Sequence, residues 1–199
     1  MNFLDTFLAI VISYLIGSIP FGYLLARLKG IDIMELGSGN IGATNVWRNL
    51  GPVPGLAVLL LDMGKGAVAV WLGKYLGGIE TELLAAVAVL FGHSWSVFLR
   101  FKGGKMIATG GGVVLAMSPV LILVCLVVWL TTVAVTRYVS LGSMLAAVSI
   151  PVTMMMIDMS LWHISFGIAM ALLAIYKHRA NISRILDGTE FKVTKGGRK

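Results

Sequence analysis

Residues 106–136 read MIATGGGVVLAMSPVLILVCLVVWLTTVAVT and contain no charged side chain. As one helix this run would extend roughly 46 Å at 1.5 Å per residue, which exceeds a hydrocarbon core of about 30 Å. Ser118 and Pro119 lie inside the run, and a proline begins a helix more readily than it continues one. We therefore predict two helices here, over 105–117 and 119–136.

The composition of the 199-residue chain places these helices in a membrane. Apolar residues make up 58% of the sequence and charged residues only 13%, whereas a soluble domain has about a quarter charged. The net charge is +7, and the basic residues flank apolar segments. This pattern favours anionic lipid headgroups over nucleic acid as the partner. We expect an all-α integral membrane protein, folded as a single polytopic domain over 1–199.

The distribution of basic residues selects the number of spans. If 106–136 forms two helices, most of the 16 Lys and Arg residues fall on one side of the membrane, in 29–52, 98–105, 137–138 and 177–199. The positive-inside rule then places the N-terminus outside and the C-terminus in the cytoplasm. We predict about seven transmembrane helices, over 3–28, 53–73, 83–99, 105–117, 119–136, 139–157 and 160–176, followed by a basic cytoplasmic tail over 177–199.

A polar loop between the first two predicted spans reads GSGNIGATNVWR at 37–48. Its glycines let backbone N–H groups converge without interference from Cβ atoms, which suits an anion. We expect a short helix from Ile41 to Leu50, with Asn40 as its N-cap and Gly51 at its end. The alternative is a tight interfacial turn that binds lipid headgroups. The candidate phosphate-binding residues of this loop are Ser38, Gly39, Asn40, Thr44 and Asn45, together with the guanidinium of Arg48.

A second cluster of positive charge reads FKGGK at 101–105. Lys102 and Lys105 flank Gly103 and Gly104, so the segment combines flexible backbone with two point charges. It is either a second phosphate-binding segment or a marker of the cytoplasmic side.

The third cluster begins at the end of the last predicted span. If that helix continues past the membrane, His178, Asn181 and Arg184 share one of its faces, and Arg179 adds a further charge. The alternative is a basic lipid anchor.

Polar residues also lie inside or at the ends of the apolar spans. Asp62 and Lys65 are three residues apart in the second span and can pair with each other, either to orient the site or to contact substrate. Ser140 and Ser143 lie at the predicted membrane level of the polar loops. They are candidate substrate contacts, or hydroxyls bonded to the preceding helical turn.

The usual catalytic sets are missing from the sequence. There is no G-x-S-x-G nucleophile motif, and no converging carboxylates or His and Cys residues suggest a metal. We therefore expect neither a metal nor a cofactor. A reaction here would depend on positioning and electrostatics, with a substrate that carries its own leaving group.

Four segments together resemble the signature loops of the bacterial acyl-phosphate–glycerol-3-phosphate acyltransferases. The segments are 37–48, 92–109, 138–143 and 178–184, and the resemblance extends in order from Gly17 to Glu190. The chain departs from the family pattern at Ser96, where we expect proline, and at Met106, where we expect glycine.

The resemblance implies a seven-helix enzyme of the bacterial inner membrane with cytoplasmic active-site loops. It implies transfer of an acyl group from acyl phosphate to the 1-hydroxyl of glycerol 3-phosphate, giving lysophosphatidic acid and inorganic phosphate in the first step of phospholipid synthesis. The enzyme that produces acyl phosphate is then a candidate partner, besides membrane lipid. Two alternatives stay open, a transporter of phosphorylated metabolites and an acyltransferase that uses acyl-CoA. The predicted catalytic residues are Arg48, Lys105, His178 and Asn181.

Overall fold

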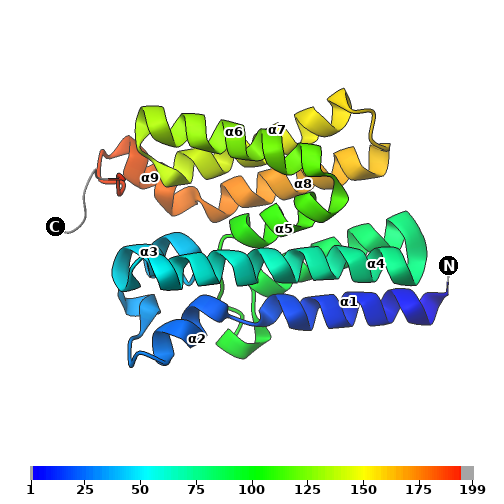
Figure 1. Cartoon of the computed structure of the whole chain (residues 1–199), viewed down its shortest axis with the longest axis horizontal. Coiled ribbons are helices and arrows are strands. Elements are labelled where there is room, and N and C mark those ends of the chain that lie inside the picture. The colour runs from blue at the N-terminus through cyan, green and yellow to red at the C-terminus, as the bar shows by residue number, and fades with distance from the viewer. Residues whose placement is uncertain (1, 194–199) are drawn as a thin grey trace. The chain divides into compact units, whose positions relative to one another are not determined.

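The computed structural model describes residues 2–193 of the chain, so the end of the predicted basic tail, 194–199, lies outside the described residues. Over the described range the chain is helical, and its only β pairing is an isolated bridge between Ser96 and Lys102. The α-helices are α1 (Phe3–Ser18), α2 (Phe21–Arg27), α3 (Ala43–Leu50), α4 (Pro52–Ser94), α5 (Ile107–Met117), α6 (Pro119–Thr136), α7 (Val139–Met156), α8 (Leu161–Lys177) and α9 (Arg179–Leu186), and two short 3₁₀ helices are η1 (Ile33–Glu35) and η2 (Val97–Leu99) (Figure 1).

The chain divides into two compact units, Met1–Ser118 and Pro119–Lys199. Their boundary coincides with the predicted break in the uncharged run, because α5 ends at Met117 and α6 begins at Pro119. The prediction of two helices in this run is confirmed. The prediction of a single polytopic domain stays a prediction.

In the first unit α1 packs along the second half of α4. Gly17 lies against the backbone of Val89 so closely that a Cβ would overlap it. Near the other end of the same helix pair, the hydroxyls of Thr6 and Thr81 share a buried hydrogen bond of 2.8 Å. Small residues thus permit the close approach that stabilises helix pairs in membranes.

Helix α4 is a hairpin of two arms. Its 43 residues hold two helices joined at a kink, where the backbone leaves the helical region at Gly77 and Gly78. Gly78 has a φ of 71°, which only glycine adopts without strain. Across this turn Gly73 lies against the backbone of Glu82. The two arms correspond to two of the predicted spans.

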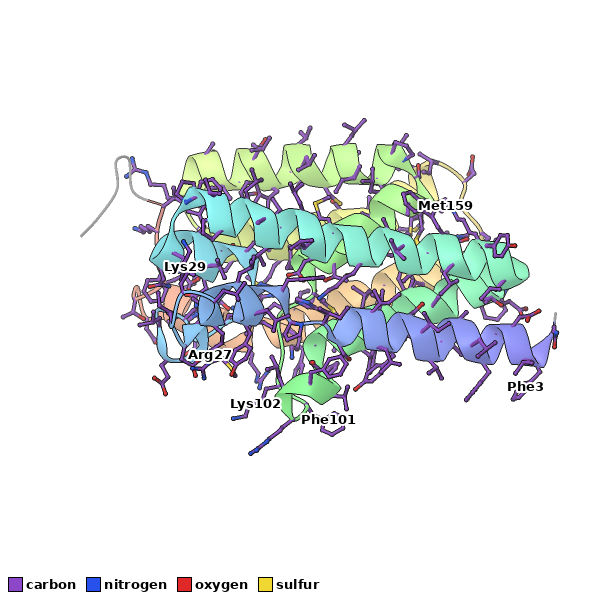
Figure 2. The ribbon with its side chains drawn as sticks, turned by 60° about the horizontal axis from the view of Figure 1, so that its bottom comes forward. Phe3, Arg27, Lys29, Phe101, Lys102 and Met159 are labelled. Atoms are coloured by element: carbon purple, nitrogen blue, oxygen red, sulfur yellow. The ribbon has the colours of Figure 1, made fainter. Side chains whose placement is uncertain are left out.

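Two predicted spans differ from the observed helices. The first, 3–28, is interrupted between α1 and α2, because Pro20 has no N–H group to continue the helical ladder. The third, 83–99, ends as α-helix at Ser94, where the chain turns into η2. Arg27 and Lys29 lie at the opposite end of the first unit from Phe3 (Figure 2).

In the second unit α6 packs on α7, and α7 packs on α8 (Figure 1). Gly142 of α7 lies 3.2 Å from the carbonyl oxygen of Trp129 in α6, measured from where its Cβ would be. Helix α9 follows α8 directly, with His178 as the residue between them.

Four helical segments within residues 2–193 are long and apolar enough to cross a membrane. They are Phe3–Arg27, Pro52–Ser94, Pro119–Thr136 and Val139–Met156, and two shorter apolar helices are Ile107–Met117 and Leu161–Lys177. The number of seven spans and the outside position of the N-terminus stay predictions.

Candidate active site

The first polar loop is organised by the side chain of Asn45, which is only 2% exposed. Its Nδ2 group donates to the carbonyl oxygens of Ile33, Leu36 and Asn40 at 3.3, 3.0 and 2.9 Å. Its Oδ1 atom accepts from the N–H of Ser38 at 3.1 Å. Asn45 was predicted to bind phosphate, but the geometry makes it the residue that fixes the path of the loop.

The helix of this loop begins later than predicted. Gly42 is the N-cap of α3, and Asn40 Oδ1 accepts from the N–H of Gly42 at 2.8 Å. The predicted N-cap role of Asn40 is therefore wrong, because its side chain closes a local turn before the helix starts. Gly51 ends the helix as predicted, with a φ of 97°. Thr44 and Arg48 share one face of α3, and both are exposed.

The backbone amides predicted to hold a phosphate are used within the loop itself. The N–H of Ser38 donates to Asn45, and the N–H of Gly39 donates to the carbonyl of Leu36 at 2.9 Å. Ala43 and Thr44, in contrast, begin α3, and N–H groups at the first helical positions lack an acceptor within the helix. These are the amides of the loop best placed to meet an anion.

The second loop folds back on the end of α4. The N–H of Gly104 donates to the carbonyl of His93 at 2.9 Å, and the N–H of Ser96 donates to the carbonyl of Lys102 at 3.2 Å. A Cβ at Gly103 would overlap the His93 carbonyl. Close backbone packing therefore explains why glycine occupies this site.

The two lysines of the second loop have different surroundings. Lys102 is exposed and projects away from the loop together with Phe101 (Figure 2). Lys105 is half-buried. Of the two ammonium groups, that of Lys105 is the more shielded from solvent and therefore the stronger candidate for a fixed contact with an anion.

The two departures from the family pattern have structural counterparts. Met106 has a φ of 58°, a left-handed conformation that glycine adopts more easily, and its side chain is buried. Ser96 Oγ accepts from the N–H of Phe98 at 3.2 Å and donates to the carbonyl of Ser18 at 2.6 Å. A proline at this position could form neither bond.

The predicted pair of Asp62 and Lys65 is confirmed. Lys65 Nζ lies 2.7 Å from Asp62 Oδ1, and each side chain is 2% exposed. Sequence reasoning missed two further partners of the ammonium group, the carbonyl of Ile19 at 3.0 Å and Nδ1 of His93 at 3.0 Å. His93 is not linked to Lys65 by any helical spacing, so only the packing of the α4 arms shows this contact.

In the second unit three predicted site residues meet at Glu190, which sequence reasoning did not include in the site. Glu190 Oε1 accepts from Ser140 Oγ and from Asn181 Nδ2, each at 2.7 Å. Its Oε2 atom accepts from Arg184 Nε at 2.8 Å. The only signal in the sequence was that Glu190 ends the family resemblance.

The Glu190 carboxylate is charged at neutral pH. Burial raises the pKa of this carboxyl, but the hydrogen bonds from Asn181, Ser140 and Arg184 outweigh burial, and the pKa lies below its ordinary value of 4.5. As an ionised group it only accepts hydrogen bonds. It therefore fixes the orientation of three donors.

His178 lies at the junction of α8 and α9 and is 3% exposed. Its Nδ1 atom lies 2.7 Å from the carbonyl oxygen of Ala174. Because a carbonyl oxygen only accepts, Nδ1 carries the proton of this hydrogen bond.

The remaining predicted contacts of this unit have other partners. Ser143 Oγ donates to the carbonyl of Val139 at 2.9 Å, which is the helical-turn alternative left open for it. Arg179 is exposed, and its guanidinium lies 4.6 Å from the ring centre of Tyr176. Among the described residues, no group of three or more His, Cys, Asp or Glu side chains could hold a metal ion.

The sequence profile of the glycerol-3-phosphate acyltransferase family matches residues 7–188. The chain belongs to this family. The glycerol-3-phosphate acyltransferase of Desulforamulus reducens is 55% identical over 195 residues, covering 97% of this chain and 98% of that protein. That of Desulforudis audaxviator is 54% identical over 191 residues, covering 96% of each.

A solved structure shares the fold of this chain. The crystal structure of PlsY (YgiH), an integral membrane glycerol 3-phosphate acyltransferase, in its glycerol 3-phosphate form has a TM-score of 0.92 at 38% identity, covering 95% of this chain and 96% of that one. The family resemblance in the sequence is thus confirmed, as are the helical multi-pass membrane class and the assignment as an acyltransferase.

Proposed function

We propose that this acyltransferase moves the acyl group of an acyl phosphate to the 1-hydroxyl of glycerol 3-phosphate. The products are lysophosphatidic acid and inorganic phosphate. The observation that carries the proposal is the pairing of family membership with loops that present cationic and amide donors. The relative PlsY was also solved in a glycerol 3-phosphate form and in a lysophosphatidic acid form.

The first unit supplies donors suited to phosphate. Thr44 and Arg48 share a face of α3, whose first amides point the positive end of the helix dipole outward. Arg48 can bind two phosphate oxygens at once, and Lys105 adds a point charge beside the double glycine. The hydroxyl of Ser38, Asn40 and the exposed Lys102 complete the proposed phosphate contacts of this unit.

The second unit supplies donors suited to glycerol 3-phosphate. Asn181, Ser140 and Arg184 are oriented by Glu190, so small movements of one would affect the others. His178, whose ring is held by the carbonyl of Ala174, is a further proposed contact. Arg179 and Ser143 are the outer members of this proposed set.

The chemistry needs no residue as a nucleophile. The 1-hydroxyl oxygen attacks the acyl carbonyl carbon, a C–O bond forms, and the bond between that carbon and the phosphate oxygen breaks. The departing phosphate takes the hydroxyl proton and leaves as inorganic phosphate. The protein contributes by positioning the two substrates and by stabilising the negative charge with Arg48 and Lys105.

The proposed setting is the bacterial inner membrane, with seven spans, the N-terminus outside and the active-site loops in the cytoplasm. The concentration of Lys and Arg in the loops supports this orientation. Acyl phosphates are reactive anhydrides, so the enzyme that produces them is a candidate partner. Single cysteines introduced at the loops and labelled from each side of sealed vesicles would test the orientation.

The decisive experiment supplies purified protein in detergent with acyl phosphate, glycerol 3-phosphate or both. We expect inorganic phosphate to be released only when both are present, in a 1:1 ratio with lysophosphatidic acid. Acyl-CoA in place of acyl phosphate is the matched control. If acyl-CoA supports turnover and acyl phosphate does not, the proposed donor is wrong.

The phosphate contacts are tested by exchanging the two cations. Arg48→Lys removes two-point binding and Lys105→Arg alters a compact charge, so we expect each to lower kcat/KM by about tenfold or more. Near-full activity in both variants would show that Arg48 and Lys105 do not bind the substrate phosphates as proposed. A bell-shaped pH profile that His178→Ala abolishes, with unchanged KM values, would make His178 the base in place of the departing phosphate.

A further inference from the structure

A buried polar network in the first unit joins the intramembrane charges to the second loop. Lys65 Nζ contacts Asp62 Oδ1 at 2.7 Å, the carbonyl of Ile19 at 3.0 Å and Nδ1 of His93 at 3.0 Å. His93 in turn accepts the N–H of Gly104 at its carbonyl, at 2.9 Å. The chain of contacts therefore runs from the first arm of α4, through the second arm, to the loop that carries Lys105.

The ammonium group defines the state of the histidine ring. A protonated lysine only donates, so His93 Nδ1 accepts and the ring proton lies on Nε2. The same ring is 4% exposed, and Nε2 is the atom nearest to where a Cβ of Gly104 would lie. The imidazole ring thus packs directly against Gly104, and the contact with Lys65 fixes the orientation of that ring.

Joining helices does not in itself require charged residues. Charges buried in a membrane are costly, and an apolar pair of similar size is often as stable. Helix α1 is joined to the second arm of α4 by the Thr6–Thr81 bond at 2.8 Å, and to the residue after that arm by the Tyr14 hydroxyl, which donates to the carbonyl of Trp95 at 2.9 Å. What the network adds is a fixed orientation of His93.

We infer that Asp62, Lys65 and His93 act as positioning residues, which set the conformation of the Gly103–Gly104 segment and thereby the placement of Lys105. This inference rests on the proposed function, since it assigns the positioned segment to binding a phosphorylated substrate. The inferred role requires no contact between these three side chains and that substrate. They act on Gly104 through the packing of the His93 ring and through the hydrogen bond to the His93 carbonyl.

A double-mutant cycle tests this coupling. The pair Asp62→Leu and Lys65→Met removes both charges together, so that no charge is left buried alone, and releases the imidazole. In the native background Gly104→Ala forces a methyl group against a fixed ring, and we expect it to raise the KM for a phosphorylated substrate by about tenfold or more. In the released background we expect Gly104→Ala to add less than about threefold.

The matched control is Thr6→Val with Thr81→Val. It removes a buried polar pair that joins α1 to the second arm of α4, which is the arm that carries His93, away from the loop. Its effect on KM should be independent of Gly104→Ala, so that the fold-change of the combined variant equals the product of the separate fold-changes. If the fold-changes in KM of the Asp62→Leu/Lys65→Met pair and of Gly104→Ala also combine as a simple product, the positioning role is excluded.

Hydrogen exchange of the Gly104 amide gives a second readout that needs no substrate. We expect faster exchange in the Asp62→Leu/Lys65→Met protein than in the native protein, and no change in the threonine control. Equal exchange in all three proteins would overturn the inference even if the proposed donor proved correct. Inactivity of the native protein toward acyl phosphate would overturn the proposed function alone.

Discussion

The first polar loop and the end of the second unit are each built around one buried polar side chain, but in different ways. Asn45 is neutral, and its amide holds the backbone of its own loop, with bonds that span at most 12 residues. Glu190 is charged and joins side chains as far as 50 residues apart. A local neutral network shapes a loop, whereas a charged long-range network ties helices together. The two should therefore respond differently to mutation and to pH.

The largest effect is expected from Glu190→Ala. It leaves Ser140, Asn181 and Arg184 without their common acceptor, and each of the two buried donors that loses its partner costs about 1–3 kcal/mol in stability. We expect loss of activity with a lower melting temperature in detergent, measured by differential scanning fluorimetry. Asp187→Ala, which removes an exposed carboxylate nearby, should leave both values close to native.

The next largest effect is expected from Asn45→Asp. The substitution keeps the shape of the side chain but turns its donor into an acceptor that faces three carbonyl oxygens. The free-energy penalty for holding the loop in its native conformation is then about 3 kcal/mol. We expect kcat/KM to fall by about 100-fold while the melting temperature of the protein changes less than in Glu190→Ala. A variant that melts as early as Glu190→Ala would show that the loop, too, supports the fold.

The pH dependence separates the two networks further. The pKa of Glu190 is lowered on folding, so its stabilisation is complete above its ordinary value of 4.5 and is lost as the pH falls through the lower folded value. The difference in melting temperature between the native protein and Glu190→Gln should therefore be constant above about pH 5 and shrink below 4.5. The corresponding difference for Asn45→Ala should not change with pH. A parallel change in both would contradict the assignment of the charge to Glu190.

The smallest effect is expected from Asn49→Asp. Asn49 lies four residues after Asn45 on the same helix, and its amide donates to the Asn45 carbonyl and to Asn45 Oδ1 at 2.9 and 3.0 Å. It is exposed, so water can replace what the substitution removes. We expect less than about a threefold change in kcat/KM. A fall in kcat/KM as large as that of Asn45→Asp would show that water does not replace the hydrogen bonds of the exposed Asn49.

Most of the fold was predictable because apolar length and proline placement are local properties. Ser118 and Pro119 marked the break between α5 and α6 directly, and the spacing of Asp62 and Lys65 predicted their pairing. The break after Ile19 was not predicted, since Pro20 lies in an apolar run long enough for one span. Helix bounds at such breaks depend on what the freed carbonyls contact.

The candidate site was predictable as a set of residues but not as a set of roles. Composition identified Asn45 as a polar residue of a glycine-rich loop, yet its function in holding three carbonyls follows from the turn that η1 makes before it. His93 contacts Lys65 through tertiary packing alone, and Glu190 reaches Ser140 in the same way, although Asn181 and Arg184 are within nine residues of it. No periodicity in the sequence links either one to its partners.

The interruption at Pro20 has a consequence for engineering this protein. A continuous helix would be an obvious route to a more heat-resistant variant, and Pro20→Ala would be a natural first choice. Straightening the chain there would carry the Ile19 oxygen into an ordinary helical bond and take from Lys65 one of its acceptors. A gain in thermal tolerance at this site would thus be obtained at the expense of turnover, and the irregularity should be left in place by anyone redesigning the molecule.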